Sequence, residues 1–484
     1  MSEADFARGQ EPPPHARYNH VVIIGGGASG VLLACHLLRD PDRDIRVTLV
    51  EKRPEIGRGI AYFTANPGHL LNVRATNMSA FPDQPDHFWR WLCAREDEVA
   101  AAWRVPSDPF CFAPRKIYGD YIGSLIAPLT SERKGRLRII WGECASIAEN
   151  QSDVTVTLAD GSRYHGDVAV LAIGFDSAPP HRAACYVDPW VAPADAGVKP
   201  NHRILIVGTG LTMVDYVLSL SLSGHRGPVF AISRRGLLPR GHRPVQPLRI
   251  DQADVPFGKS MTELLRWLRE LSHAQIEQGG DWRSIVDGIR PHTQRIWQEL
   301  PLAARRSFLE HARAWWGAHR HRMAPEVETR INATIASGRL TVTAGKLCDV
   351  EPGNADVLIR YRKRGATTVE TLHVDEIVDC RQIGSTPLKA VNPALRSLID
   401  QGLARPDPLC IGIDVTPDSA IISRAGVASQ RLFAVGPLTR AAFWEIIAIP
   451  DITKQCMTLA DRLCRALSAQ AQSSGAAFAE QIPA

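Results

Sequence analysis

Two glycine-rich turns in this sequence have the residue types and the spacing to hold the phosphates of a dinucleotide. The first runs from Gly25 to Gly30, between apolar runs at 21–24 and 31–38. Gly25 permits a sharp turn, Gly27 leaves room for a pyrophosphate beside the backbone, and Gly30 lets the following helix pack closely on a sheet. The free N–H groups at the start of such a helix attract phosphate.

An acidic residue follows at the distance that suits a ribose. The apolar strand expected at 45–50 ends in Glu51 and Lys52, about twenty residues after Gly30, where a carboxylate can accept hydrogen bonds from ribose hydroxyls. This context favours a dinucleotide site over an incidental glycine-rich turn or a membrane-spanning segment. The residues predicted to contact the first dinucleotide, including a glycine at the end of a later strand, are Gly25, Gly27, Ala28, Ser29, Gly30, Glu51, Lys52 and Gly174.

The second glycine-rich turn predicts a site for a phosphorylated nicotinamide dinucleotide. It follows the apolar run 204–207, and Met213 stands where the third glycine would be, which weakens the match. The next strand, 229–232, ends in a serine and two arginines, which suit a ribose 2′-phosphate. A solvated basic turn is the alternative interpretation of the arginines. The predicted contacts to this dinucleotide are Gly208, Gly210, Leu211, Thr212, Ser233, Arg234 and Arg235.

Each glycine-rich unit is followed by a strand-rich segment and a late strand that ends in glycine. This repeat predicts an α/β fold with two Rossmann-like dinucleotide-binding domains, the architecture of a two-dinucleotide-binding flavoprotein, with a helical insert. A further strand ends at Gly436 and returns the chain to the first domain, with Thr439 facing the cofactor. The expected parts are a disordered tail (1–18), an FAD-binding domain (19–182, completed by 385–467), an NADP-binding domain (200–245 and 338–384), a helical insert (246–337) and a flexible tail (468–484).

Composition restricts the classes of function. The 484 residues carry a formal net charge of +5 with scattered basic residues, so neither nucleic-acid binding nor a membrane span is expected. The ten cysteines form no CxxC pair and no metal-ligand pattern. This favours reduced thiols in a cytoplasmic protein and argues against a disulfide reductase and against a bound metal.

Stretches spread over nearly the whole chain resemble a bacterial family of FAD/NAD(P)-binding proteins. This family is similar to flavin-dependent N-hydroxylating monooxygenases, some of which oxidise an amino-acid amine, including nitrosuccinate-forming aspartate N-monooxygenases. The matching stretches are 25–30, 59–62, 69–73, 208–215, 319–322, 436–439, 443–445 and 450–452. Two departures stand out: Arg381 and Gln382 follow Cys380 where relatives usually have Thr-Gly, and Thr453 replaces a usual arginine.

The resemblance implies an enzyme that uses FAD, NADPH, O2 and a small-molecule substrate. The expected function is an FAD-dependent, NAD(P)H-consuming monooxygenase that oxidises an amine or other small nucleophile through a flavin C4a-hydroperoxide. Because the cofactor carries the chemistry, no separate catalytic triad is required. Two alternatives stay open: a reductase or electron-transfer protein without oxygenation, and a non-catalytic redox sensor. The sequence predicts no particular oligomeric state.

The resemblance also implies where the flavin ring and the substrate lie. The segment 69–77 follows the ribose strand, which makes Asn72 and Arg74 candidates for the flavin environment. Trp444 and Glu445 follow the last return strand and are expected, with Thr439 and Arg440, to lie against the flavin or its entry face. In the insert, the basic run predicts an anionic-substrate site, with a solvated basic face as the alternative; its candidate residues are His319, Arg320 and Arg322.

Overall fold

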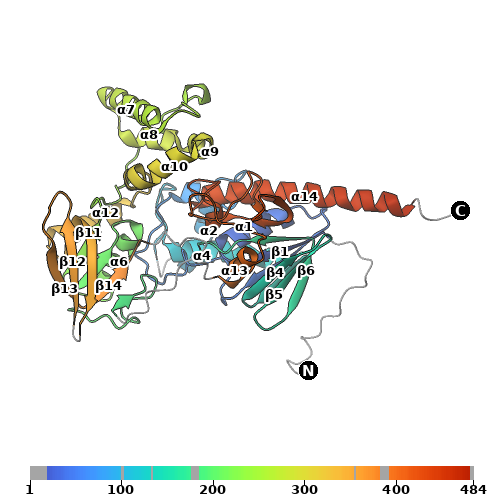
Figure 1. Cartoon of the computed structure of the whole chain (residues 1–484), viewed down its shortest axis with the longest axis horizontal. Helices are drawn as coiled ribbons and strands as arrows, with labels where there is room; N and C mark the ends of the chain where they lie inside the picture. Colours follow the sequence, from blue (N-terminus) through green and yellow to red (C-terminus); the bar gives the residue numbers. More distant parts are fainter. Residues whose placement is uncertain are drawn as a thin grey trace.

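The protein is described by a computed structural model, in which each of two domains is built on a large β-sheet and helices of an insert lie above them (Figure 1). The structure describes residues 19–99, 103–131, 135–175, 185–353, 356–381 and 392–479, with side chains up to 467. Both domains have the predicted order of strand, glycine turn, helix and strand. The α/β fold with two Rossmann-like domains is therefore confirmed.

The first domain is built on a sheet of order β15-β16-β7-β1-β2-β3, in which only the edge strand β15 runs antiparallel to its neighbour. Alternate residues of β1 serve two cores: Val21 and Ile23 face the helices on one side, and Val22 and Ile24 face the other side. The strands are β1 (Asn19–Ile24), β2 (Ile45–Glu51), β3 (Leu137–Trp141), β7 (Val168–Leu171), β15 (Ala420–Ile422) and β16 (Ala428–Ala434).

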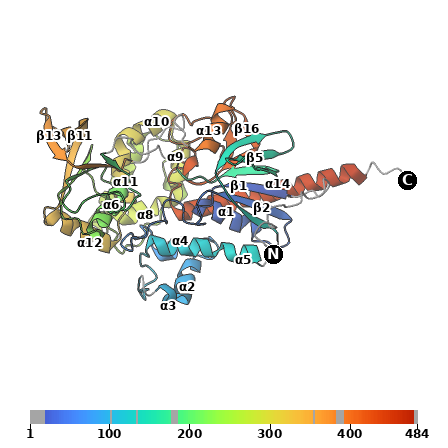
Figure 2. The same ribbon diagram turned by 90° about the horizontal axis from the view of Figure 1, so that it is seen from below.

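Helices cover one face of this sheet, and a meander with a single helix covers the other (Figure 2). The first face carries α1 (Ala28–Leu38), α2 (His87–Ala94), α3 (Glu96–Val99), α4 (Arg115–Ser124), α5 (Ile126–Ser131) and α14 (Ile449–Ala479). The second face carries β4 (Cys144–Glu149), β5 (Val154–Leu158), β6 (Arg163–Gly166) and α13 (Pro393–Asp400). The helix α14 runs to Ala479, within the segment 468–484 that the sequence assigns to a flexible tail; the alanines and glutamines there favour helix.

The second domain is built on a sheet of order β13-β12-β11-β10-β9-β14-β8. Its long strand β11 pairs in parallel with β10 up to Ala344 and then antiparallel with β12 from Gly345, so one strand both completes the nucleotide fold and opens the meander. The strands are β8 (Tyr186–Val187), β9 (Ile204–Val207), β10 (Val229–Ser233), β11 (Leu340–Pro352), β12 (Val357–Lys363), β13 (Glu370–Val374) and β14 (Glu376–Asp379).

The helix α6 (Leu211–Leu222) follows β9 in this domain, and the insert helices connect β10 to β11. Figure 1 shows α7, α8 and α9 standing away from the second sheet, whereas α12 packs with α6 on its core. The insert contains α7 (Met261–Glu277), α8 (Trp282–Gly288), α9 (Thr293–Glu299), α10 (Leu302–Ser307), a π-helical turn (Phe308–Ala312), α11 (Arg313–Arg320) and α12 (Pro325–Ala336). Among the described residues, no helix is long and apolar enough to cross a membrane.

Candidate functional site

The first glycine turn has a backbone that only glycine tolerates at two of its positions. Gly25 has a φ of +106°, and a Cβ there would lie 2.6 Å from the carbonyl oxygen of Ala172 at the end of β7. A Cβ on Gly30 would lie 1.9 Å from the carbonyl oxygen of Gly25. The turn and the first helical residues are thus packed as closely as backbone atoms allow, which is the packing that a dinucleotide fold requires.

The start of α1 leaves its backbone N–H groups free for an anion. Gly27 is the N-cap, its position has no side-chain hydrogen bond to the helix, and no acidic residue stands in the first turn, which begins with Ala28 and Ser29. A Cβ on Gly27 would lie 3.4 Å from the Cα of Gly59, at van der Waals contact. An uncapped helix start beside bare backbone fits the pyrophosphate of FAD.

Glu51 lies where the sequence analysis placed it, at the end of β2, but its carboxylate also serves the turn itself. Its Oε2 accepts a hydrogen bond of 2.6 Å from the N–H of Gly26, and its Oε1 accepts one of 2.8 Å from the N–H of Arg53. Each oxygen keeps a further lone pair that a ribose hydroxyl can use. Lys52 instead forms an exposed ion pair of 2.9 Å with Glu143.

The late return strand β16 brings a second glycine to the start of α1. Gly436 has a φ of +76°, and a Cβ there would lie 2.6 Å from the Oγ of Ser29. Thr439, which is fully buried, donates from its hydroxyl to the carbonyl oxygen of Gly436 at 2.9 Å and accepts from Gln455. Gly174 lies shortly after the end of β7, with a φ of +72° and open space beside its Cα.

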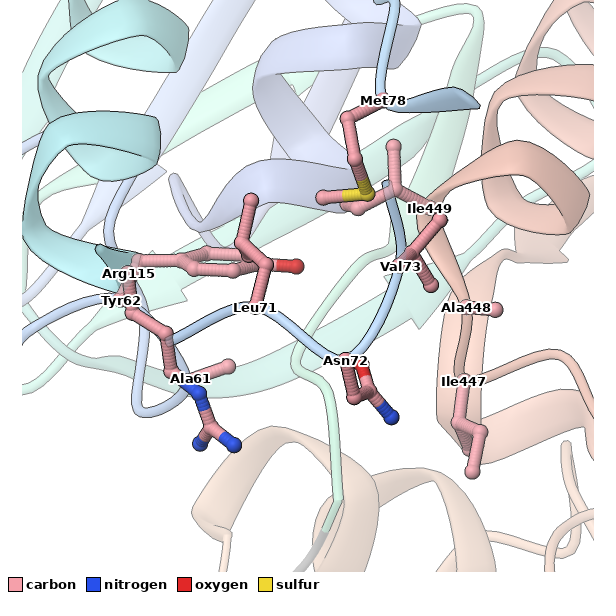
Figure 3. Close-up of a pocket in the computed structure, with 10 residues that line it drawn as sticks. All are labelled: Ala61, Tyr62, Leu71, Asn72, Val73, Met78, Arg115, Ile447, Ala448 and Ile449. Carbon is pink, nitrogen blue, oxygen red and sulfur yellow. The ribbon is translucent and has the colours of Figure 1, made fainter. Parts of the chain in front are cut away.

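A cavity lies between the segment that follows β2, the start of α4 and the start of α14 (Figure 3). Asn72 lines it, whereas Arg74 does not: Arg74 donates to the carbonyl oxygen of Arg243 at 3.1 Å and lies over the ring of Phe110. The lining residues are Ala61, Tyr62, Leu71, Asn72, Val73, Met78, Arg115, Ile447, Ala448 and Ile449. The predicted segment 69–77 contributes Leu71, Asn72 and Val73, whereas most of the other lining residues are ordinary apolar or basic residues from distant segments.

The wall of this cavity also joins the two domains. Arg115 of α4 forms an ion pair of 2.8 Å with Asp215 of α6. His69 has a pKa lowered by burial, and its Nε2 lies 2.8 Å from the carbonyl oxygen of Asp215, so a neutral ring with a proton on Nε2 fits this contact. His242, after β10, reaches the carbonyl oxygen of Asn72 at 3.0 Å. The segment from His69 to Asn72 therefore contacts both the cavity and the second domain.

The second glycine turn has the same arrangement as the first, but more space surrounds the glycine that begins its helix. Gly208 has a φ of +115°, and a Cβ there would lie 3.1 Å from backbone atoms of Cys380. Gly210 is the uncapped N-cap of α6, which begins with Leu211 and Thr212, and a Cβ on it would meet no atom within 4 Å. Met213, in place of the third glycine, is fully buried in the core of the second domain.

The residues at the end of β10 and just after it differ in the contacts that they make with the rest of the protein. Ser233 shares a hydrogen bond of 2.8 Å with the hydroxyl of Thr209 and accepts another from the N–H of Gly236. Arg235 donates to the carbonyl oxygen of His311 in the insert at 2.8 Å and lies over the ring of Trp315. Arg234 is exposed and has no ion-pair partner among the described residues.

Glu445 is buried and bound by the insert. Its Oε2 accepts a hydrogen bond of 2.9 Å from the Nε of Arg320, and its Oε1 accepts one from the indole of Trp316. Burial alone would raise the pKa of Glu445, but Arg320, His321 and these hydrogen bonds together hold it below its ordinary value. The neighbouring Trp444 stacks on Trp297 of α9 at a centroid distance of 4.5 Å.

The basic run of the insert is thus largely paired with carboxylates of the protein itself. Arg320 pairs with Glu445, and Arg322, which is 2 % exposed, donates to Asp287. His319 hydrogen-bonds through its Nδ1 to the carbonyl oxygen of Trp315 at 2.8 Å. These contacts give the arginines a structural task, and their contact with a substrate stays a prediction.

Two departures from the family pattern also have a place. Arg381 pairs with Asp379 at 2.6 Å, immediately after β14; Gln382 lies outside the described residues. Thr453 is 1 % exposed in α14, and its hydroxyl has no hydrogen-bond partner among the described residues.

Comparison with known proteins finds related folds over nearly the whole chain. Residues 22–176 match the model of a FAD-NAD(P)-binding family. An ornithine N-hydroxylase from Kutzneria sp. 744, solved with reduced FAD, NADP+ and L-ornithine, superposes with a TM-score of 0.62 at 13 % identity and covers 93 % of this chain and 99 % of its own. An L-lysine 6-monooxygenase from Pseudomonas syringae gives 0.61 at 16 % identity, with coverage of 92 % and 99 %.

A third match is the FAD-bound cadaverine monooxygenase of the desferrioxamine pathway from Erwinia amylovora. It gives a TM-score of 0.59 at 13 % identity and covers 93 % of this chain and 95 % of its own. No curated protein matches the sequence. At these identities the structural matches show a shared fold, that of flavoproteins with two dinucleotide-binding domains, as the sequence predicts.

Proposed function

We propose that this chain is an FAD-dependent, NADPH-consuming monooxygenase that oxidises a small amine. The observation that carries the proposal is the pair of uncapped helix starts, those of α1 and α6, each beside a bare glycine turn in one chain. The family match of residues 22–176 and the fold shared with amine-oxidising monooxygenases support it.

The first domain would hold FAD through its backbone. Gly25, Gly27 and the helix start at Ala28 to Gly30 would bind the pyrophosphate, and Glu51 would accept from the ribose. The contact of Gly436 with Ser29 would position the start of α14 against the same cofactor. When bound, FAD supplies the exchange of electrons between NADPH, oxygen and substrate.

The second domain would hold NADPH. The backbone at Gly208 and Gly210, with Leu211 and Thr212, would bind the pyrophosphate, and the residues after β10 would bind the 2′-phosphate through charge-assisted hydrogen bonds. The pair of Arg115 with Asp215 would keep this domain in register with the first.

The insert would exclude water from the flavin face. The stack of Trp297 on Trp444 and the buried pair of Arg320 with Glu445 tie it to the return segment at two points. We place Asn72, Trp444 and Glu445 around the reacting centre, and Arg74 and His319 at its outer edge. The carboxylates that pair with Arg320 and Arg322 reduce the net charge available to an anionic substrate.

The test follows NADPH oxidation, oxygen uptake and peroxide release by purified protein, first alone and then with a panel of amines. A monooxygenase consumes one molecule of O2 for each amine oxidation and releases less hydrogen peroxide with the amine present than without it. Faster turnover with an electron acceptor, and no product from any amine, would instead favour a reductase. Negligible turnover under all conditions would favour a sensor. Gly27→Leu, which fills the space beside Gly59, serves as the flavin-free control.

A further inference from the structure

Contacts connect three parts of the chain that are distant in sequence: the turn after β10, the insert and the loop before β15. The turn after β10 reaches the insert, because Arg235 contacts His311 and Trp315 on either side of Arg313. The insert reaches the loop before β15, because Arg306 donates to the carbonyl oxygen of Pro408 at 3.2 Å. Arg440, after β16, donates from its Nε to Ile411 in that same loop.

Arg440 is an unusual buried cation. It is 6 % exposed, its Nη1 has no hydrogen-bond partner, and its guanidinium lies 5.1 Å from the ring centroid of Phe175. The nearby carboxylate of Asp407 is 2 % exposed and accepts hydrogen bonds from three backbone N–H groups, those of Leu409, Ile411 and Gly412. That carboxylate is therefore used largely within its own loop.

Arg313 is electrostatically coupled to both Arg440 and Arg234. Burial and the charge of Arg234 lower the pKa of Arg313, and burial and the charge of Arg313 lower the pKa of Arg440 to about 10. Among the described residues, none of the three guanidinium groups forms an ion pair with a carboxylate. A group of mutually repelling cations, one of them with an unbonded buried N–H, is complementary to an anion with several oxygens.

We propose that Arg234, Arg313 and Arg440 form a composite site for a phosphate group of the nicotinamide dinucleotide. Arg234 comes from the second domain, Arg313 from the insert and Arg440 from the return segment of the first domain. The inference rests on the proposed function, since it assigns these arginines to the cofactor of the second domain. In this arrangement the second domain, the insert and the return segment of the first domain all contact the dinucleotide, so that its binding draws the insert and both domains together.

The experiment measures binding of NADP+, 2′,5′-ADP and 5′-ADP to FAD-loaded protein by calorimetry. Arg313→Gln removes one cation and should weaken NADP+ by about ten- to a hundredfold, the usual value of one charge-assisted bond. Arg313→Lys keeps the charge and should recover part of this loss. Arg306→Gln, on the same insert, is the matched control and should bind like the wild type.

The probes identify the phosphate. A loss by Arg313→Gln that is confined to NADP+ and 2′,5′-ADP assigns the 2′-phosphate, and a loss that extends to 5′-ADP assigns the pyrophosphate. Wild-type affinity of Arg313→Gln for all three probes would overturn the composite site while leaving the proposed function intact. Absence of NADP+ binding by the wild type would overturn both. Thermal unfolding of each variant checks the fold; because Arg313 has no carboxylate partner among the described residues, its loss should not lower the midpoint.

Discussion

The two glycine turns share a backbone but differ in what closes them. At the second residue of the first turn, the N–H of Gly26 donates to the carboxylate of Glu51. At the equivalent place in the second turn, the hydroxyl of Thr209 bonds Ser233. The hydrogen bond between the glycine turn and the second strand is thus made by a charged carboxylate in the first domain and by neutral hydroxyl groups in the second. A free ribose suits the first environment, and a phosphorylated ribose beside arginines suits the second.

The third glycine shows how far the sequence motif can relax. In the first domain α1 passes so close to its turn that Gly30 has no room for a Cβ. In the second domain the equivalent residue, Met213, fills the core. The two domains also differ in how they are completed. The return strand β16 completes the first domain. The second domain carries the helical insert, which contacts the first domain through the ion pair of Arg320 with Glu445.

The largest effect is expected where the insert of the second domain binds the first. Glu445→Ala leaves the guanidinium of Arg320 buried without its partner, which typically costs about 3–5 kcal/mol. We expect faster hydrogen exchange in α9 and α11 and a lower unfolding midpoint. Glu299→Ala, which removes an exposed pair with Arg295 in the same insert, should change stability by less than about 1 kcal/mol. Equal effects of the two variants would contradict a docked insert.

The next effect tests the difference at the glycine turns. Gly30→Ala places a methyl group against the carbonyl oxygen of Gly25, and we expect a cost of about 3 kcal/mol together with loss of bound flavin. Gly210→Ala meets open space and should leave flavin content and stability unchanged. Flavin absorbance per chain and urea unfolding measure both quantities. Full flavin content in the Gly30→Ala protein would show that FAD does not bind at this glycine turn.

The arginines after β10 test the chemical difference between the two sites. Replacing Arg234 and Arg235 by alanine should raise the KM for NADPH by about ten- to a hundredfold for each phosphate contact that is lost, since one charge-assisted bond contributes about 1.5–3 kcal/mol. The KM for NADH should hardly change. Steady-state kinetics with both cofactors provides the comparison. Equal use of NADH and NADPH by the wild-type protein would show that the arginines do not recognise the 2′-phosphate.

The smallest effect concerns the helix behind each turn. Burial lowers the pKa of His36 in α1 to about 4, whereas Ser219 occupies the equivalent position in α6. The unfolded chain takes up this proton first as the pH falls from 6.5 toward 4, so the stability that the neutral ring allows is present above pH 6.5 and lost below it. We expect His36→Gln to reduce the loss of stability between pH 8 and pH 5 by about 2 kcal/mol. Gln in place of the exposed His273 is the control.

The sequence predicted the two nucleotide units because their signals are local. Gly25, Gly30 and Glu51 lie within one strand-turn-helix-strand segment, where each residue type follows from backbone geometry. The cavity wall was largely missed, since Tyr62, Arg115 and Ile447 come together only through the tertiary fold.

The basic run of the insert shows a second limit of sequence reasoning. Arg320 was predicted to face a substrate, and the structure pairs it with Glu445, 125 residues away. Charge alone could not distinguish these partners, because both are anions. The electrostatic coupling of Arg313 to Arg234 and Arg440 also depends on the tertiary fold and left no signal in the sequence.

The most direct test of the two-site account is a titration of FAD-loaded protein with NADP+, with both nucleotides counted per chain by equilibrium dialysis. The account predicts one FAD and one NADP+ bound together, with loss of FAD alone in Gly27→Leu and loss of NADP+ alone in the Arg234 and Arg235 double variant. Displacement of FAD by NADP+, or a single nucleotide bound per chain, would contradict it.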